Sequence, residues 1–235
     1  MIGRVARLVA RTQLTRGRLI ALLGIGALGI LFGVGLSASN GFTQYSDTVD
    51  MLDGYGIRLA APVIALVLAS AALGDFVDDR TLVYLWLRPV PRWQIAVGAA
   101  VASIGVAIPL VVVPMTLAGY LGASDTTLAL GAAASCAVAT LGYAGVFLAL
   151  GFKVRRALVW GLAYILIWEN FLARSVSFCA KLSVSIYARS LLDHIAGTKL
   201  PKYGATTTLS VLAPIVFALL GVIATARWLK TTEVA

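Results

Sequence analysis

Residues 95–118 read IAVGAAVASIGVAIPLVVVPMTLA and contain no charged side chain. A helix of this length rises about 36 Å, which is enough to cross a bilayer hydrocarbon core of about 30 Å. The run lacks the alternation of polar and apolar residues that is typical of barrel strands. In lipid, a continuous apolar run must be helical because every backbone amide and carbonyl needs a partner within the segment. This segment therefore predicts a membrane-spanning helix.

Comparable apolar runs occur along the rest of the chain. We predict six spans in a single transmembrane domain over residues 1–235, at residues 19–36, 57–74, 95–118, 126–152, 157–173 and 208–226. The composition agrees, because 60% of the 235 residues are hydrophobic and only 12% are charged, against about 25% charged in a soluble domain. The predicted fold class is an all-α integral membrane protein, which excludes a soluble domain, a disordered tail and a disulfide-stapled module.

The first apolar run has an alternative interpretation as a cleaved signal peptide, since the small residues Ser37, Ala38 and Ser39 follow it. Its apolar core is longer than the usual 7–15 residues of such a peptide, and five more runs follow. We therefore interpret residues 19–36 as a span.

Basic residues concentrate in segments that the six-span layout places on one side of the membrane. They are Arg4, Arg7, Arg11, Arg16, Arg18, Arg80, Arg88, Arg92, Lys153, Arg155, Arg156, Arg227 and Lys230. The positive-inside rule then places both termini in the cytoplasm. The basic residues after Glu169 oppose this orientation, but long segments follow the rule less strictly. The excess of arginine over lysine, with abundant alanine and glycine, points to a bacterial inner membrane.

The first 18 residues predict a helix that lies in the membrane interface. Their charged face contains Arg4, Arg7, Arg11 and Arg18, and their apolar face contains Ile2, Val5 and Val9. Such basic amphipathic helices bind in the plane of the headgroups, although a simple positive anchor that only fixes orientation is an equal alternative. Anionic headgroups also account for the net charge of +9, so that no nucleic-acid partner is needed.

Segment 75–94, DFVDDRTLVYLWLRPVPRWQ, predicts a short helix at the cytoplasmic surface. Asp78 or Asp79 can cap its amino-terminal end. Arg88 ends the helix because a residue before proline disfavours helical geometry. The helix exposes apolar side chains between charged ends, which is typical of a protein interface, and the alternative is a helix that lies flat on lipid.

The same segment resembles the cytoplasmic signature of ABC-2 type permeases, the transmembrane subunits of ATP-binding-cassette transporters. The string that carries the resemblance is Asp78-x-Arg80-Thr81-Leu82-x-x-Leu85-x-x-Arg88-Pro89-Val90-Pro91-Arg92-Trp93, between the second and third spans. One departure is Arg80, which stands where the family commonly has glycine. The six-span layout and the basic amino terminus are similar to the family as well.

The resemblance implies that segment 75–94 is a coupling helix that docks on a separate ATP-binding subunit. The docking residues it implies are Asp78, Asp79, Arg80, Thr81, Leu82, Leu85, Trp86, Arg88 and Pro89. It also implies a dimer with a second copy or a homologous permease, surrounded by membrane lipid. A short extracellular or re-entrant helical element between the fifth and sixth spans is expected at residues 175–195, from its weak amphipathicity and from the family.

No nucleotide-binding motif G-x-x-x-x-G-K-[ST] occurs in the sequence, so this chain cannot cradle ATP phosphates through that motif. We therefore expect no cofactor on this chain, with ATP and magnesium on the partner subunit. An enzyme is disfavoured because the sequence has a single histidine, His194, and neither H-E-x-x-H nor G-x-S-x-G. Cys136 and Cys179 offer no disulfide or metal framework.

Glu169 is the second site to single out, because it lies about 20 Å along the fifth span from Arg156. An ionisable group at such a depth is a functional hypothesis by default, here a substrate or outer-gate residue. The alternatives are an ion pair with Arg174, Lys181 or Arg189, or simple exposure at the outer surface.

The predicted function is thus export of a hydrophobic or amphipathic substrate such as a drug, lipid or peptide, with import left open. The alternative is a secondary transporter or channel without an ATPase. That alternative needs coupling-ion ligands in the spans, where Glu169 is the one acid near the membrane, and an inverted repeat, which the sequence does not show.

Overall fold

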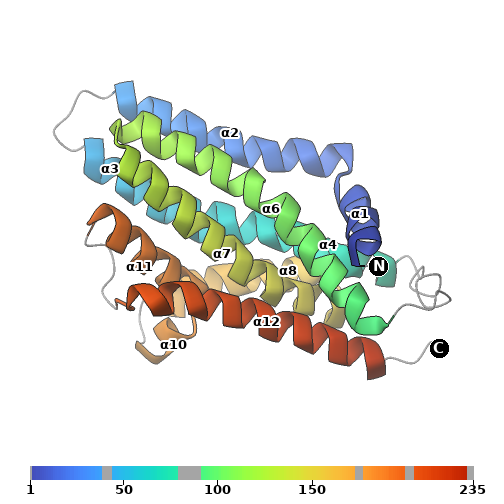
Figure 1. The fold of residues 1–235 in the computed structure, drawn as a ribbon. Coiled ribbons are helices and arrows are strands. Elements are labelled where there is room, and N and C mark those ends of the chain that lie inside the picture. Colours follow the sequence, from blue (N-terminus) through green and yellow to red (C-terminus); the bar gives the residue numbers. More distant parts are fainter. Residues whose placement is uncertain (1, 39–43, 79–90, 173–176, 199–203, 232–235) are drawn as a thin grey trace.

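The computed structural model describes residues 2–38, 44–78, 91–172, 177–198 and 204–231, and every regular element in these ranges is a helix. The elements are α1 (Ile2–Gln13), α2 (Arg16–Ala38), α3 (Gln44–Met51), η1 (Leu52–Ala60), α4 (Ala61–Asp78), α6 (Arg92–Ala123), α7 (Thr126–Lys153), α8 (Ala157–Ala163), η2 (Tyr164–Leu172), α10 (Ser177–Lys181), α11 (Val184–Ala196) and α12 (Thr207–Thr231). The long helices form one bundle (Figure 1). The predicted all-helical class is confirmed for the described residues.

Five helices of this bundle are long and apolar enough to cross a membrane. They are Arg16–Ala38, Gln44–Asp75, Arg92–Ala123, Thr126–Lys153 and Thr207–Thr231. The fifth predicted span, residues 157–173, forms the shorter apolar helix Ala157–Leu172, which would reach only about 24 Å at 1.5 Å per residue. The described structure thus supports five long spans, with a short sixth apolar helix beside them.

Two boundaries differ from the sequence prediction. The amino-terminal helix ends at Gln13 rather than reaching residue 18, and Arg18 belongs to the first turn of α2, where its guanidinium pairs with Asp75 at 2.7 Å. The second apolar helix begins at Gln44 rather than at residue 57. The reason is that Thr48 and Asp53 of this stretch are buried by tertiary contacts, which a hydropathy scale does not take into account.

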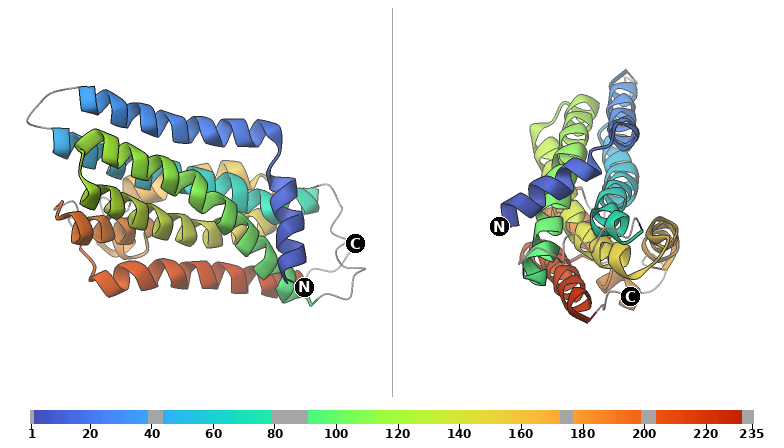
Figure 2. Two further views of the ribbon diagram at one scale, coloured as in Figure 1. Left: turned by 45° about the horizontal axis from the view of Figure 1, so that its top comes forward. Right: turned by 90° about the vertical axis from the view of Figure 1, so that its right-hand side faces the viewer.

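Both termini lie at the same end of the bundle, together with the end of α4 and the start of α6 (Figure 1). We call this the terminal end. Helix α1 crosses the bundle axis there and packs on α6 (Figure 2). It buries Val5 and Val9 while Arg4, Arg7 and Arg11 remain exposed, as its amphipathic sequence requires.

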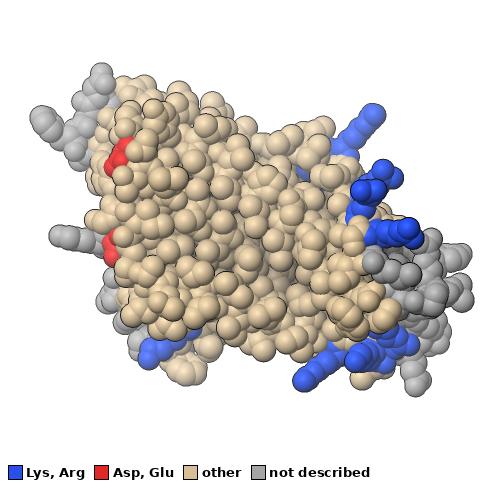
Figure 3. All heavy atoms as spheres, in the orientation of Figure 1, with Lys and Arg blue, Asp and Glu red and all other residues tan. Residues whose placement is uncertain are grey.

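Charge follows the same axis. Figure 3 shows that most lysines and arginines on the viewed face lie at the terminal end, that acidic groups lie at the opposite end, and that the band between them carries neither. An uncharged band between two polar ends is the surface that a bilayer would cover. Helix α2 faces outward in this band, because its apolar window is only 22% buried against 83% for Gln44–Asp75.

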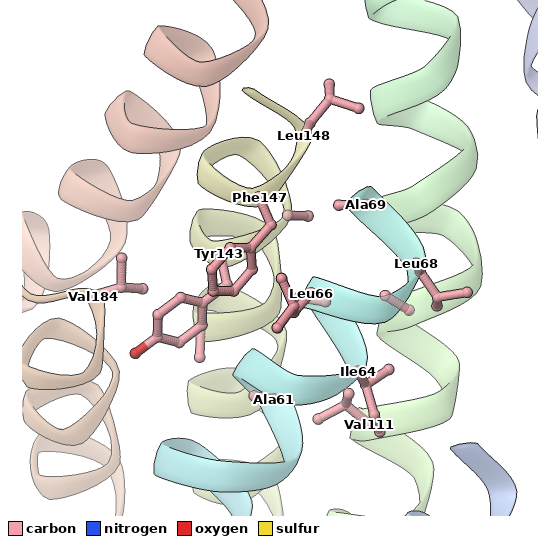
Figure 4. Close-up of a cluster of buried hydrophobic side chains, with 14 of the residues drawn as sticks. Ala61, Ile64, Leu66, Leu68, Ala69, Val111, Tyr143, Phe147, Leu148 and Val184 are labelled. Atoms are coloured by element: carbon pink, nitrogen blue, oxygen red, sulfur yellow. The ribbon is translucent and has the colours of Figure 1, made fainter. Parts of the chain in front are cut away.

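Helix α7 lies at the centre and packs on α4, α6, α11 and α12. Its Tyr143 and Phe147 rings are fully buried and stack with centroids 5.9 Å apart. Figure 4 shows both rings between α4 and the segment that begins at Val184. The core of the bundle therefore includes residues of α11, which falls in the segment 175–195 where the sequence predicts a short extracellular or re-entrant element.

Small residues bring several backbones into direct contact. A methyl group on Gly145 of α7 would overlap the backbone of Ala218 in α12, and one on Gly151 would lie 2.5 Å from Ser70 Cα in α4. Gly33 of α2 approaches Ala118 of α6 in the same way, with the added carbon 2.6 Å from the carbonyl oxygen. Close approach through small residues is a common way for membrane helices to pack, and here it operates within one chain.

Candidate functional site

Glu169 lies in η2, a stretch of π-helix, and only 2% of its surface is exposed. A π-helix shifts the side chains that follow it relative to a regular α-helix, and such stretches are frequent at functional sites. The hydrogen-bond partners of Glu169 lie at the start of α11, a helix in the half of the bundle away from the terminal end (Figure 1). Exposure at the outer surface, one of the two alternatives from the sequence, is therefore wrong.

Neutral donors surround the Glu169 carboxylate. It accepts hydrogen bonds from the Ser183 hydroxyl, from the Ser185 hydroxyl at 2.7 Å, from the Val184 backbone N–H at 3.2 Å and from the Tyr164 hydroxyl at 3.3 Å. Ser183–Ser185 is the segment that enters α11, so the carboxylate fixes the start of that helix. Charge-assisted bonds of this kind are stronger than neutral ones.

No cation among the described residues forms an ion pair with Glu169. Arg189 binds a different acid, Lys181 is exposed, and Arg174 lies outside the described residues. The ion-pair alternative is therefore wrong for Lys181 and Arg189. Burying an unpaired carboxylate is costly unless hydrogen bonds compensate, which explains the number of donors around it.

The hydroxyls of Ser183 and Ser185 also lie within hydrogen-bonding distance of each other, at 2.8 Å. Together with Glu169 Oε2 they make a triangle in which each pair of oxygens is close enough to share a proton. Because the two hydroxyls carry one proton each, they can serve two sides of that triangle at a time.

A second buried charged group lies nearby and was missed by the sequence analysis. Asp53 of η1 accepts from Arg189 Nε of α11 at 2.5 Å and from Arg58 of η1 at 3.2 Å. Arg58 is buried, and its Nε and Nη1 atoms have no hydrogen-bond partner within the described part of the chain. The available signal was Arg58 itself, a charge inside the predicted span 57–74, which requires a partner in lipid.

The two groups meet on α11. Ser185, which binds Glu169, and Arg189, which binds Asp53, are four residues apart and therefore share one face of that helix. Helix α11 contacts η1, and η1 contacts η2. We call Asp53, Arg58, Tyr164, Glu169, Ser183, Ser185 and Arg189 the buried polar cluster. It joins three segments, two of them π-helical, by charged and hydroxyl groups.

The buried polar cluster connects α11 to η1 through Arg189 and Asp53, and connects the start of α11 to η2 through Glu169. Its two acids and two arginines balance in charge. No group of three or more potential metal ligands from His, Cys, Asp and Glu occurs in the described ranges. The cluster connects its three segments through ion pairs and hydrogen bonds.

The predicted docking residues fall almost wholly outside the described residues. Asp78 is the last residue of α4, and Asp79, Arg80, Thr81, Leu82, Leu85, Trp86, Arg88 and Pro89 lie in the stretch 79–90 that the structure does not describe. The structure does place the two helices on either side of this stretch. Helix α4 ends and α6 begins, after Pro91, at the terminal end.

Comparison with known proteins adds no family. No protein-family model matches this chain, and no curated protein is similar enough in sequence to be a relative. The fold and the site define a multi-pass helical membrane protein with the buried polar cluster in one half of its bundle.

Proposed function

We propose that this chain is the transmembrane subunit of an ATP-binding-cassette transporter of the ABC-2 type. In this proposal it exports a hydrophobic or amphipathic substrate, such as a drug, lipid or peptide, and a separate ATP-binding subunit drives it. The short apolar helix Ala157–Leu172 supplies the sixth span. A second copy of the chain, or a homologous permease, completes the pathway.

The observation that supports the proposal is the convergence at the terminal end. The crosswise amphipathic α1, the end of α4 and the start of α6 all lie there (Figure 2), and the sequence that connects α4 to α6 carries the family-like motif of residues 78–93. A partner that binds this connection would act directly on α4 and α6, both of which pack on α7.

The basic terminal end faces the cytoplasm of a bacterial inner membrane in this proposal. Its arginines and lysines follow the positive-inside rule. Arg58 and Arg189 do not count against this orientation, because Arg58 is buried and both side chains are bound to Asp53. The ATP-binding subunit would then meet the chain on the side where ATP is available.

The mechanism is mechanical. Nucleotide closes a pair of ATP-binding subunits, the connection between α4 and α6 carries the motion, and the buried polar cluster opens or closes the outer half. A ligand shifts such an equilibrium only when it binds the two arrangements unequally. The buried polar cluster supplies the contacts that must differ between the two arrangements.

Two experiments test the proposal. Mild solubilisation of native membranes should recover an ATP-binding subunit with this chain, whereas a chain that always purifies alone would count against it. The double variant Leu82→Asp/Leu85→Asp should lose the partner or uncouple ATP hydrolysis while still inserting into the membrane. The matched control is Leu8→Asp/Leu14→Asp, which adds the same charge at two exposed leucines of the terminal end.

A secondary transporter is the second candidate, and Glu169 favours it. A buried carboxylate that is held by neutral donors within a membrane helix is the kind of group that marks an ion pathway. Liposomes that contain this chain alone distinguish the two. Transport driven by a proton gradient without any ATP-binding subunit would establish the second candidate, and absence of such transport supports the first.

A further inference from the structure

A cavity of about 360 Å³ opens at the terminal end between α2, α4, α7 and α8. This volume lies in the range of small-molecule binding sites. Its floor is made of small residues, Ser70, Ala71 and Gly74 of α4 and Gly151 of α7. The cavity lies far from the buried polar cluster and takes no part in the mechanism proposed above.

The charged residues in the lining of this cavity are mostly cations. Arg18, Lys153, Arg155 and Arg156 contribute to it, with Asp75 as the one acid. Asp75 is already occupied, because Arg18 binds it with two parallel hydrogen bonds of 2.7 and 3.1 Å. Lys153 lies over the ring of Trp228 at 5.6 Å. Arg155 and Arg156 are exposed and form no salt bridge with any described side chain.

The backbone at Arg156 is also unusual. Its φ is +66° and its ψ is +43°, in the left-handed region where glycine or asparagine is normally found. Strained positions of this kind persist where the surroundings require them, and they cluster at ligand sites. Here the left-handed turn between α7 and α8 places two consecutive arginines on the cavity.

The cavity also borders the surface that lipid would cover. Leu158 lines it, and the neighbouring Val159 and Trp160 of α8 are 63% and 61% exposed. An amphipathic molecule in the membrane could therefore place its polar head among the arginines and its apolar part along α8. Tryptophan at this level is typical of the membrane–water interface.

We propose that this cavity binds a phosphate-bearing anion through Arg155 and Arg156, with an anionic phospholipid headgroup as its source. Guanidinium groups bind phosphate oxygens in a paired geometry, and basic pockets between membrane helices are suited to lipid headgroups. The Arg18–Asp75 pair limits the affinity, since the Asp75 carboxylate repels an anion that approaches Arg18.

The test measures binding to the full chain purified in a neutral detergent. Phosphatidylglycerol, phosphatidylcholine and inorganic phosphate are titrated separately, and native mass spectrometry reports the number bound and the affinity. Saturable binding of phosphatidylglycerol over phosphatidylcholine supports the proposal with lipid as the source. Phosphate binding of equal strength, lost in the same variants, supports the site and corrects the source.

Three variants locate the site. Arg155→Gln/Arg156→Gln should weaken binding by on the order of tenfold or more, since each charge-assisted bond contributes at least that much. Arg156→Gly relieves the left-handed backbone and removes the charge, so weaker binding in this folded variant cannot be attributed to unfolding. Asp75→Asn removes the repulsion and should tighten binding several-fold.

The control Arg7→Gln/Arg11→Gln removes the same charge from exposed positions on α1, outside the cavity. It should leave the affinity within about twofold, because diffuse attraction to a basic surface contributes little at a specific site. If the control weakens binding as much as Arg155→Gln/Arg156→Gln does, the lipid is held by the basic surface as a whole and the proposal is overturned. Absence of saturable binding to all three ligands overturns it as well.

Discussion

The two halves of this molecule both contain ion pairs between arginine and aspartate, and these pairs differ in how far they are exposed to solvent. In the buried polar cluster, Asp53 is enclosed with Arg58 and Arg189, and the side chains are at most 15% exposed. At the terminal end, Arg18 and Asp75 form a pair whose side chains are 33% and 37% exposed, beside arginines without a described partner. The same types of residue therefore form an enclosed ion pair in one half and a partly exposed ion pair beside the proposed anion site in the other.

The difference in solvent access sets what each pair can do. Two enclosed charges stabilise each other strongly only while both are present, because losing one leaves the other unpaired in a poorly solvated site. A half-exposed pair is screened by water and contributes about 0–1 kcal/mol. Each of the following substitutions tests this contrast.

The largest effect is expected for Asp53→Ala, which leaves two buried arginines without their acid. The free energy of unfolding should fall by about 3–5 kcal/mol, measured by thermal or denaturant unfolding in detergent. The triple variant Asp53→Leu/Arg58→Met/Arg189→Met, which removes all the charges together, should recover most of the loss. If the triple variant does not recover stability, the unpaired arginine charges are not the source of the loss in Asp53→Ala.

Glu169→Ala should be the next largest, at about 2–3 kcal/mol, because it leaves the N–H of Val184 and at least one of the two serine hydroxyls without an acceptor. Glu169→Gln keeps an acceptor and adds donors, so its stability should lie much closer to that of the parent chain. If transport is lost in Glu169→Gln at nearly normal stability, Glu169 acts through its charge or proton. Equal stability of both variants would contradict the role assigned to the carboxylate.

Asp75→Asn should have the smallest effect, below about 1 kcal/mol. The pair Asp75→Asn and Asp53→Asn makes the same chemical change at a partly exposed acid with one arginine partner and at an enclosed acid with two, so the two losses of stability can be compared directly. A loss at Asp75 as large as that at Asp53 would remove the distinction between the two halves. Unfolding at low and high salt sharpens the comparison, since only the exposed pair should weaken as salt is raised.

The sequence predicted the long apolar helices well, because their runs of uncharged residues leave no other structure in lipid. It began the second span at residue 57, whereas the apolar helix that contains this span begins at Gln44, since Asp53 lowers the hydropathy of the preceding stretch although Asp53 itself is buried. It also extended the first helix to Arg18, whose partner Asp75 is distant in the chain. Each error occurs where a charge is neutralised by a residue that local patterns cannot identify.

The candidate site was predicted in part. The depth of Glu169 in its span was sufficient to select it, but its partners Ser183 and Ser185 become visible only when α11 folds back on η2. The sequence predicts a short extracellular or re-entrant element at residues 175–195. In the structure α11 is largely buried, because Arg189 turns inward to Asp53.

The contacts of Gly145 with Ala218 and of Gly151 with Ser70 have a consequence for motion. Main chains that touch directly leave no side chains between them whose rotamers could change, so α4, α7 and α12 must turn as one block. Any change of shape is then confined to junctions that side chains mediate, above all those of α11 with η1 and η2. A motion that the connection between α4 and α6 transmits would then displace the long helices jointly, relative to the short ones.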